Sequence, residues 1–302
     1  MKEITRSAVA RLLPVRVPDA HKGDYGRVLV VAGSRGMCGA GFLCAKSALL
    51  VGAGLVYWAL PESMQPSFAA ALPEAITVPL PQTQTGEISQ DAWPVLQALI
   101  ERIHPSVLVI GPGMGKSPLL PLVLAECRLP LVLDADALNT LAEMKNQFFK
   151  QPVIFTPHPG EMARLLQKEI ATDSFAREHQ IGQWLTKAGG VCVLKGRGTL
   201  VAVSRDGQTE IWQNTTGGSA LAKGGSGDVL AGMIAGLWSQ LGTKVGFDVM
   251  SAFQMAACAV YIHGLAGDLA AQAKSVYSVL ASDTAQYIGP AIRQILNQEK
   301  AE

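Results

Sequence analysis

The sequence has few charged and few aromatic residues. Asp, Glu, Lys and Arg together make up 16% of the 302 residues, and Phe, Trp and Tyr make up 6%. The 25 basic and 24 acidic residues leave a net charge of +1, so the chain lacks the basic surplus of proteins that bind DNA or RNA non-specifically. Hydrophobic residues account for 49%, which predicts a large core and a single domain over residues 1–302.

Cysteines are few, and none stands in a CxxC pair, which excludes the common zinc and redox motifs. The odd number and apolar neighbours indicate buried thiols in a reducing compartment, so we expect a cytoplasmic protein. The N-terminus lacks the apolar block of a signal peptide. The most apolar stretch, 40–60, is interrupted by Lys46 and by glycines, and we therefore expect no membrane span. The five cysteines are Cys38, Cys44, Cys127, Cys192 and Cys258.

Short apolar runs alternate with helical patterns along the chain. This alternation predicts an α/β fold with a mostly parallel central sheet and helices on both faces. The expected strands lie within 27–33, 54–60, 107–113, 129–139, 153–161 and 191–203. The expected helices are 38–52, 91–103, 159–168 and 174–189, followed after residue 215 by 228–241 and 248–273.

Each apolar strand run ends in Gly, Asp, His or Lys. In open α/β sheets, ligands bind beyond the carboxyl ends of the strands. We therefore expect these polar residues to converge on one edge of the sheet and to form a binding site there.

The stretch GGSGDVLAG (224–232) carries the clearest chemical signal. Glycines before a helix suit an anion site, because free N–H groups and the positive end of the helix dipole favour negative charge. Asp228 is an acid in this position, and two interpretations are open. It either caps the helix, or it lies beside a bound phosphate and acts as a base.

The stretch TPHPGE (156–161) is the second signal. Two prolines hold the chain extended around His158, and Gly160 and Glu161 begin a helix. In a purely local interpretation, Glu161 stabilises its own first turn and His158 makes a nearby hydrogen bond. In a functional interpretation, His158 contacts a ligand, and Glu161 contacts Mg²⁺ through water, which suits a cation that keeps part of its hydration shell.

The stretch LKGRGTL (194–200) predicts a strand, a cationic turn and a second strand. Spacing alone favours an ordinary hairpin with solvated charges. Lys195 and Arg197, flanked by glycines, also suit a site that grips the phosphate or frames the base of a nucleotide.

Two glycine-rich turns are weaker signals. GPGMGKS (111–117) is not a P-loop, because Ile110 stands where the Walker pattern requires glycine. GSRGMCGAG (33–41) follows a strand and opens a helix, but its glycines do not match GxGxxG. Each turn either allows a ligand close to the backbone or is purely structural.

Other polar residues carry less information. Asp134 is expected to cap or brace the turn after its strand, and Asp136 to face either the site or solvent. His263 lies in an apolar helical stretch and is expected to be a core residue. The group His21, Lys22 and Asp24 is either solvated or in contact with phosphate.

Taken together, eight stretches resemble one family in order and spacing. That family is the ADP- or ATP-dependent NAD(P)H-hydrate dehydratases of the ribokinase-like superfamily, and the resemblance covers about residues 20–288. It departs at Ser226, where many relatives have threonine, although serine keeps the hydroxyl. The stretches are HKGDYGRVLVVAGS, GAGLVYWALPES, LPEA, VIGPGMGKS, LDADALN, TPHPGEMARLL, LKGRGT and GGSGDVLAGMIAGL.

The resemblance implies a ribokinase-like three-layer sandwich and a lyase that repairs nicotinamide cofactors. The implied reaction is the ADP-dependent dehydration of the S epimer of hydrated NADH or NADPH. It proceeds by phosphorylation of the C6 hydroxyl, for which ADP or ATP is the donor, and elimination of phosphate. Mg²⁺ is the implied metal cofactor.

The resemblance also implies a role for individual residues, with Asp228 as the catalytic base and Glu161 as the magnesium contact. The implied anion cradle is Gly225, Ser226 and Gly227. The implied nucleotide contacts are Lys195, Gly196, Arg197, Gly198, Thr199 and Gly227. The implied contacts to the hydrated cofactor are Ala40, Gly113, His158 and Asp228.

Many bacterial relatives carry an N-terminal epimerase domain. Here only about twenty residues precede HKGDYG, so we expect residues 1–20 to be an extension, with no epimerase domain and a separate epimerase protein. The family also implies a homotetramer, with neither nucleic acid nor membrane as a partner.

Two other functions compete with the dehydratase. The first is a ribokinase-like kinase that phosphorylates a vitamin-precursor alcohol or a sugar. The second is a nucleotide-responsive binding protein without catalysis. The presence of Asp228 argues against the second, because a negative charge would weaken simple phosphate binding.

Overall fold

A computed structural model describes residues 1–145, 148–205 and 207–297, and within these residues ten strands form one sheet. The strands are β1 (Lys2–Glu3), β2 (Arg27–Val31), β3 (Leu55–Pro61), β4 (Ile76–Leu80), β5 (Val107–Ile110), β6 (Leu131–Leu133), β7 (Val153–Phe155), β8 (Val191–Leu194), β9 (Leu200–Arg205) and β10 (Gln208–Gln213). Their order is β1-β10-β9-β8-β7-β6-β5-β2-β3-β4. All neighbouring strands in the part of the sheet that runs β8-β7-β6-β5-β2-β3-β4 pair in parallel. Strand β9 is antiparallel to both of its neighbours, β8 and β10.

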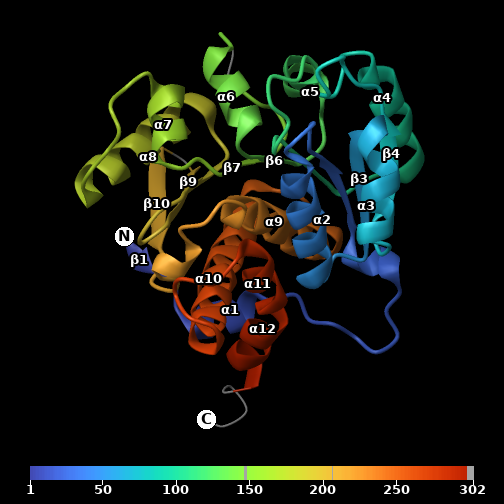
Figure 1. The fold of residues 1–302 in the computed structure, drawn as a ribbon. Helices are drawn as coiled ribbons and strands as arrows, with labels where there is room; N and C mark the ends of the chain where they lie inside the picture. Colours follow the sequence, from blue (N-terminus) through green and yellow to red (C-terminus); the bar gives the residue numbers. More distant parts are fainter. Residues whose placement is uncertain (146–147, 206, 298–302) are drawn as a thin grey trace.

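Helices cover both faces of this sheet, as the ribbon shows (Figure 1). The helices of one face are α1 (Arg6–Leu12), α2 (Cys38–Leu50), α3 (Gln65–Ala71), α9 (Ser226–Val245), α10 (Val249–Ala273), α11 (Ala281–Gln286) and α12 (Ile288–Asn297). The helices of the other face are α4 (Ala92–Ile103), α5 (Leu119–Glu126), α6 (Asp136–Glu143), α7 (Pro159–Leu166) and α8 (Ser174–Ala188). The predicted three-layer α/β fold is confirmed.

The strand sequences explain why both faces are covered. In β2, Val28 and Val30 lie in the core beneath α9 and α10, whereas Leu29 and Val31 lie in the core beneath α4 and α5. All four side chains are fully buried. A continuous apolar run therefore serves two cores, as parallel strands in the middle of a sandwich require.

Two helices of the first face, α2 and α9, cross at very short distance. A methyl group on Gly232 would lie 2.0 Å from the carbonyl oxygen of Cys44, and one on Gly236 would lie 2.7 Å from that of Ala48. Glycine at these two positions lets α9 approach the backbone of α2 directly. This contact positions the first turn of α9 at the edge of the sheet.

The first twelve residues are part of the fold. Lys2 of β1 pairs in parallel with Trp212 of β10, and α1 packs against α10 and α12. The sequence analysis placed no element in this segment. Two residues are too few to give a recognisable strand period.

Among the described residues, only α10 is long and apolar enough to cross a membrane by length and composition. Its most apolar window is 72% buried inside the protein, where the helix packs against α9, α12 and the sheet. This burial is what a core helix shows. The five cysteines are also buried, and each is a free thiol.

Candidate active site

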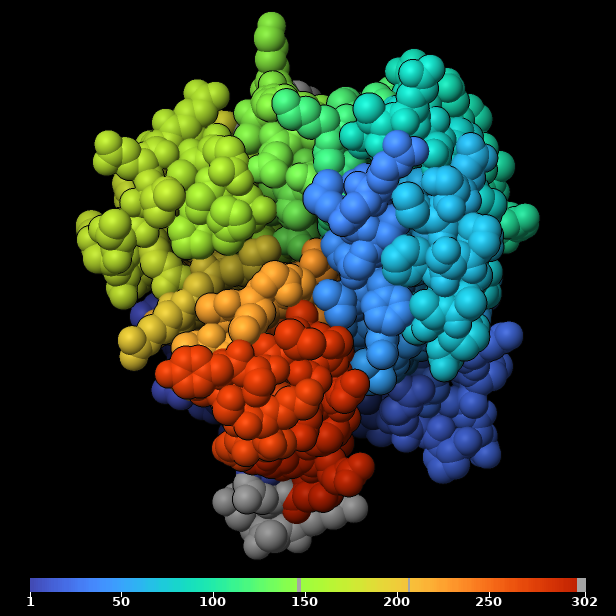
Figure 2. Space-filling model, in the orientation of Figure 1, coloured from blue at the N-terminus to red at the C-terminus, as the bar shows by residue number. Residues whose placement is uncertain are grey.

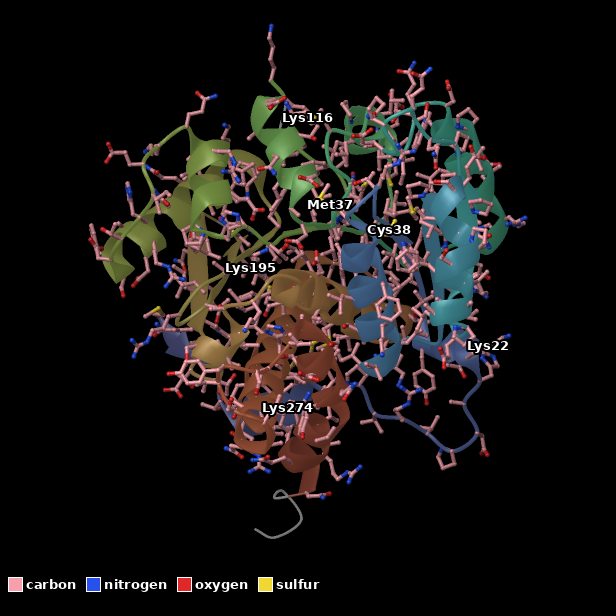
Figure 3. The ribbon with its side chains drawn as sticks, viewed as in Figure 1. Lys22, Met37, Cys38, Lys116, Lys195 and Lys274 are labelled. Atoms are coloured by element: carbon pink, nitrogen blue, oxygen red, sulfur yellow. The ribbon has the colours of Figure 1, made fainter. Side chains whose placement is uncertain are left out.

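A cavity of about 1060 Å³ lies beyond the carboxyl ends of β6, β7 and β8. Asp134 follows β6, His158 follows β7 and Lys195 follows β8, and all three line the cavity. The surface is indented where the yellow-green, orange and blue segments meet (Figure 2). Lys195 lies near the start of α9, whereas Lys22 lies far away from it (Figure 3). The predicted convergence of strand ends is confirmed.

Asp228 is the third residue of α9 and faces this cavity. The N-cap of α9 is Gly225, with φ 91°, and no side chain caps the helix. Within the described residues, the N–H groups of Gly227 and Asp228 have no recorded hydrogen bond. The capping interpretation of Asp228 is therefore wrong, and its carboxylate lies beside free N–H donors.

The neighbours of Asp228 change its basicity. Burial and the negative charge of Asp134 raise the pKa of Asp228, Lys195 partly offsets them, and the resulting pKa is about 6. A carboxyl with a pKa near 6 is ionised at neutral pH and is a stronger base than an exposed aspartate.

Asp134 and Lys195 form an ion pair in the floor of the cavity. The Asp134 side chain is almost fully buried, its Oδ1 lies 2.7 Å from Lys195 Nζ, and the Thr156 hydroxyl donates to the same oxygen at 2.7 Å. Burial lowers the pKa of Lys195, but Asp134 and Glu161 outweigh it and raise that pKa above its usual value. Lys195 therefore stays charged.

The ion pair corrects the prediction for Asp134. Its side chain does not cap α6, whose N-cap Ala135 has no side-chain hydrogen bond. It instead holds Lys195, whose Nζ would lie 3.2 Å from a methyl group on Gly227. The signal in the sequence was a carboxylate at the end of a buried strand.

His158 and Glu161 cap the start of α7. The N–H groups of Gly160 and Glu161 donate to His158 Nδ1 at 3.0 and 3.3 Å, and the N–H of His158 donates to Glu161 Oε2 at 2.7 Å. The local interpretation is thus correct for these bonds. Both side chains also line the cavity, and His158 Nε2 lies 3.5 Å from Glu161 Oε1.

These two groups have shifted pKa values. Burial, together with the charges of Lys195 and Arg164, lowers the pKa of His158. The pKa of Glu161 is raised to about 7, because burial, aided by the charge of Asp134, outweighs the opposing charge of Lys195. A neutral His158 with Nδ1 as acceptor carries its proton on Nε2, which lies 3.5 Å from Glu161 Oε1.

The β8–β9 hairpin turn forms another wall of the cavity. Arg177 of α8 donates to the carbonyl oxygens of Arg197 at 2.8 Å and Leu194 at 3.2 Å, which fixes the turn from outside. The sequence analysis did not identify Arg177. All five predicted residues of the turn line the cavity, namely Lys195, Gly196, Arg197, Gly198 and Thr199.

The sequence that forms this site, with its uncapped helix start and its glycine-flanked basic turn, matches a known protein family. Residues 28–290 match the family described as NAD(P)H-hydrate dehydratase. The chain belongs to this NAD(P)H-hydrate dehydratase family. The chain is 41% identical over 290 residues to a bifunctional NAD(P)H-hydrate repair enzyme of Moorella thermoacetica, covering 94% of this chain and 52% of that protein.

Other relatives agree with this assignment. The bifunctional NAD(P)H-hydrate repair enzyme of Escherichia coli is 33% identical over 304 residues, covering 99% of this chain and 53% of the relative. The chain thus spans about half the length of the curated relatives it matches.

Solved structures share the fold. An ADP/ATP-dependent NAD(P)H-hydrate dehydratase from Bacillus subtilis, co-crystallised with ATP and Mg²⁺, superposes with a TM-score of 0.80 and 28% identity, covering 97% of this chain and 98% of that one. Phosphofructokinase-2 from Escherichia coli superposes with a TM-score of 0.54 and 16% identity. The superposition covers 83% of this chain and 87% of the phosphofructokinase chain. It shows the ribokinase-like fold alone.

Three residues that the dehydratase resemblance assigned to the site lie outside the lining of the cavity. They are Ala40, Gly113 and Gly225. A methyl group on Gly113 would lie 2.5 Å from the Met37 carbonyl oxygen and 2.9 Å from the Ala40 side chain, and one on Gly225 would lie 2.6 Å from Leu43. Glycine is therefore explained by close packing at both positions.

The predicted anion cradle is only partly available. Ser226 and Gly227 line the cavity, but the Ser226 N–H donates to the Lys223 carbonyl oxygen at 3.3 Å. The Ser226 hydroxyl lies 3.3 Å from Nε2 of buried His263. Free donors come instead from Gly227 and from Asp228 itself.

The cavity also includes residues that sequence reasoning missed. Asn214 and Thr216 follow β10 and line it, and the Thr216 hydroxyl donates to the Tyr261 carbonyl oxygen at 2.8 Å. The sequence NTTGG at 214–218, directly after a strand, was the signal that could have identified them. His263, expected as a core residue, is buried and forms the floor beside Ser226.

The remaining polar candidates lie elsewhere. Asp136 Oδ2 accepts the N–H of Gly115 at 2.7 Å, outside this cavity. His21 and Asp24 bond to each other in the 3-10 helix Lys22–Tyr25, before the amino end of β2. These are local loop contacts, and the phosphate interpretation of that segment is not supported.

Proposed function

We propose that the protein catalyses the dehydration of hydrated NADH and NADPH, using ADP or ATP as phosphoryl donor. The observation that carries the proposal is the setting of Asp228 at the uncapped start of α9. Its pKa is raised to about 6, and it lies between free N–H groups and the Lys195 ammonium. Family membership and the name of the Bacillus subtilis enzyme support hydrated NADH or NADPH as the alcohol that receives the phosphoryl group.

In the first step, Asp228 accepts the proton of the C6 hydroxyl, and the oxygen attacks the terminal phosphoryl group of the nucleotide. With ADP as donor, AMP leaves. The free N–H of Gly227 and the Lys195 ammonium stabilise the charge on the transferred group. The basic turn at Arg197 holds the nucleotide.

In the second step, the C6–O bond breaks, and phosphate leaves with the electron pair of that bond. The ring nitrogen donates its lone pair, and loss of a proton from C5 restores the 5,6 double bond. A neutral His158, whose side chain lines the cavity and whose proton is on Nε2, orients the ring or the departing phosphate. Hydroxide alone would leave far less readily than phosphate.

The residues present fit Mg²⁺ bound chiefly through nucleotide phosphates. Among the described residues, no group of three or more His, Cys, Asp or Glu side chains forms a metal site. Asp134, Glu161 and Asp228 nevertheless bring three carboxyls to one cavity, in which the partly buried Lys195 pairs with Asp134. Mg²⁺ would neutralise phosphate charge there, with Glu161 as its contact through water.

Several finer points belong to this proposal. ADP as the preferred donor, the S epimer as substrate, cytoplasmic localisation and a homotetramer are predictions of the family resemblance.

The test is to incubate the protein with chemically hydrated NADH, Mg²⁺ and either ADP or ATP. Recovery of the reduced-nicotinamide absorbance, dependent on nucleotide, is the expected result. Consumption of nucleotide with a stable phosphate ester as product would instead identify a small-molecule kinase.

A further inference from the structure

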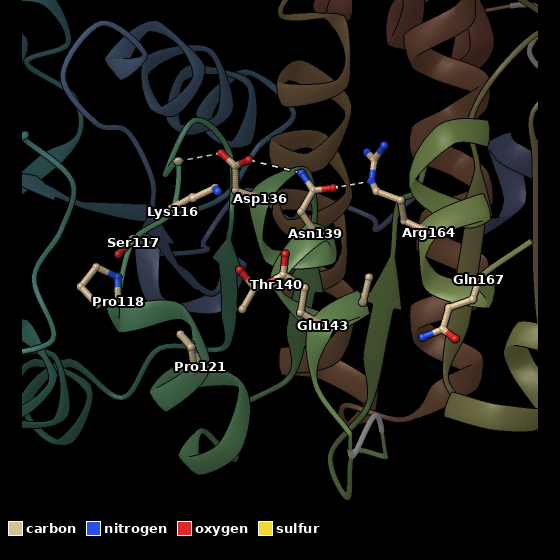
Figure 4. Close-up of a pocket in the computed structure, with 12 residues that line it drawn as sticks. Lys116, Ser117, Pro118, Pro121, Asp136, Asn139, Thr140, Glu143, Arg164 and Gln167 are labelled. Carbon is tan, nitrogen blue, oxygen red and sulfur yellow. Dashed lines mark hydrogen bonds between the residues drawn. The ribbon is translucent and has the colours of Figure 1, made fainter.

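A second cavity, of about 790 Å³, opens beside the first, between α5, α6 and α7 (Figure 4). The two cavities are lined by neighbouring residues of the same segments. Ala135 lines the active site and Asp136 lines the second cavity, and on α7 the lining passes from Glu161 to Arg164 within one turn. Ala135, at φ 47° and ψ −113°, bends the chain so that the side chains on either side of it serve different cavities.

A row of hydrogen bonds crosses the second cavity. Gly115 N–H donates to Asp136 Oδ2 at 2.7 Å, Asn139 Nδ2 donates to Asp136 Oδ1 at 3.4 Å, and Arg164 Nε donates to Asn139 Oδ1 at 2.9 Å. Figure 4 shows Lys116 at one end of this row and Arg164 at the other. The row occupies both oxygens of Asp136.

The same row fixes the guanidinium of Arg164 through Nε alone. In the part of the chain that the structure describes, its terminal nitrogens have no recorded partner, and Lys116 Nζ has none either. A held guanidinium with free terminal N–H groups is suited to bind a phosphate with two parallel hydrogen bonds.

We propose that this second cavity binds the adenosine diphosphate half of the hydrated dinucleotide, with Arg164 and Lys116 contacting its phosphate groups. The inference rests on the proposed function. With the nicotinamide beside Asp228, the rest of the substrate passes His158 and enters the second cavity.

The sizes of the cavities support this division. A cavity for one drug-sized ligand measures about 300–1000 Å³. The active site, at about 1060 Å³, has to hold the donor nucleotide together with the nicotinamide riboside. A second nucleotide half needs the adjoining space.

The test compares Arg164→Gln and Lys116→Gln with wild type. Glutamine at 164 keeps an amide donor for Asn139 but removes the positive charge. Arg128→Gln is the matched control, because Arg128 precedes the amino end of β6, at the opposite edge of the sheet. The substrates are hydrated NADPH, hydrated NADH and hydrated reduced nicotinamide riboside, which has no phosphate.

In each variant we expect the KM for hydrated NADPH to rise about tenfold or more, as loss of a charged hydrogen bond predicts. The KM for hydrated NADH either rises with it or stays unchanged. A rise for both identifies the diphosphate as the contact, and a rise for NADPH alone identifies the 2′-phosphate. The kcat, the KM for the riboside and the KM for ADP are expected to stay within twofold. Fluorescence titration with unhydrated NADPH should show the same loss of affinity without turnover.

Unchanged KM values for the dinucleotides, or a rise in the KM for ADP instead, would overturn the inference. Failure of wild type to convert any hydrated substrate would overturn the proposed function. The NADPH titration would then still test whether Arg164 and Lys116 contact a dinucleotide.

Discussion

At the scale of single residues, Asp228 shares its cavity with Asp134, Glu161 and the Lys195 ammonium. Its basicity depends on these neighbours, because burial and the charge of Asp134 raise its pKa, whereas Lys195 lowers it. A base must lose its proton before it can act, so kcat/KM should rise with pH through an apparent pKa near 6 and level off above it.

Removing the charge of Asp134 should shift this pH profile. In Asp134→Asn, one negative neighbour is lost and Lys195 is no longer neutralised, and both changes lower the pKa of Asp228. We therefore expect the acid limb of kcat/KM to move to lower pH, measured by initial rates from pH 5 to pH 8. A limb that stays in place or moves to higher pH would show that Asp134 does not act on the base.

The ammonium of Lys195 should matter for the nucleotide more than for the hydrated cofactor. In Lys195→Met, loss of a charged contact is expected to raise the KM for ADP or ATP by about tenfold or more. Lys187→Met, in the last turn of α8, is the control. If the nucleotide KM does not change, the KGRGT turn is an ordinary hairpin.

At the scale of elements, the close crossing of α2 and α9 depends on glycine. Alanine at Gly232 would place a methyl group 2.0 Å from the carbonyl oxygen of Cys44, so the helices must separate. We expect Gly232→Ala to lower the free energy of unfolding by about 1–3 kcal/mol or more, as overpacking does.

Gly182→Ala is the matched control, because a methyl group in the middle of α8 meets nothing within 4 Å. Alanine there should stabilise the helix by up to about 1 kcal/mol. Urea denaturation of both variants measures the difference. Equal effects at the two positions would contradict the described contact between α2 and α9.

The long elements were predictable, and the short ones were not. Expected helices 38–52 and 248–273 correspond to α2 (Cys38–Leu50) and α10 (Val249–Ala273), because long apolar patterns carry a clear period. The strand β1 and the six-residue helix α11 carry no such period. Tertiary packing, which a single sequence does not display, holds them in place.

The residues of the site also fall into a group that the sequence predicts and a group that it does not. Residues within one motif, such as His158 and Glu161, were found together because three positions separate them. The role of Asp134 was missed because its partners, Thr156 and Lys195, lie 22 and 61 residues further along the chain. The parallel strand order brings them together, and local sequence does not reveal that pairing.

At the scale of the whole molecule, the buried acids should make the fold less stable as pH rises. The folded-state pKa of Asp228 is raised from its usual 3.8 to about 6, and that of Glu161 from 4.5 to about 7. Below about pH 3, both groups are protonated in the folded and unfolded states, so neither affects stability. Stability then falls as pH rises toward 7 and levels off above it.

Asp228→Asn should remove part of this penalty. At pH 8 we expect the variant to be more stable than wild type by about 1–3 kcal/mol, since one pKa unit corresponds to about 1.4 kcal/mol. Near pH 3, where Asp228 is protonated in both states, the two proteins should unfold alike. Thermal unfolding at both pH values measures this, with Asp19→Asn, at an exposed position, as the control. A variant less stable than wild type at pH 8 would contradict the assignment of Asp228 as a base whose pKa is raised by burial.

The measurement that tests the account most directly is turnover of hydrated NADH by wild type and Asp228→Asn, beside nucleotide binding by both. The account predicts that the variant binds the nucleotide as wild type does but restores the reduced-nicotinamide absorbance at least about a hundredfold more slowly, the scale expected for loss of a general base. Near-normal turnover in Asp228→Asn would contradict it.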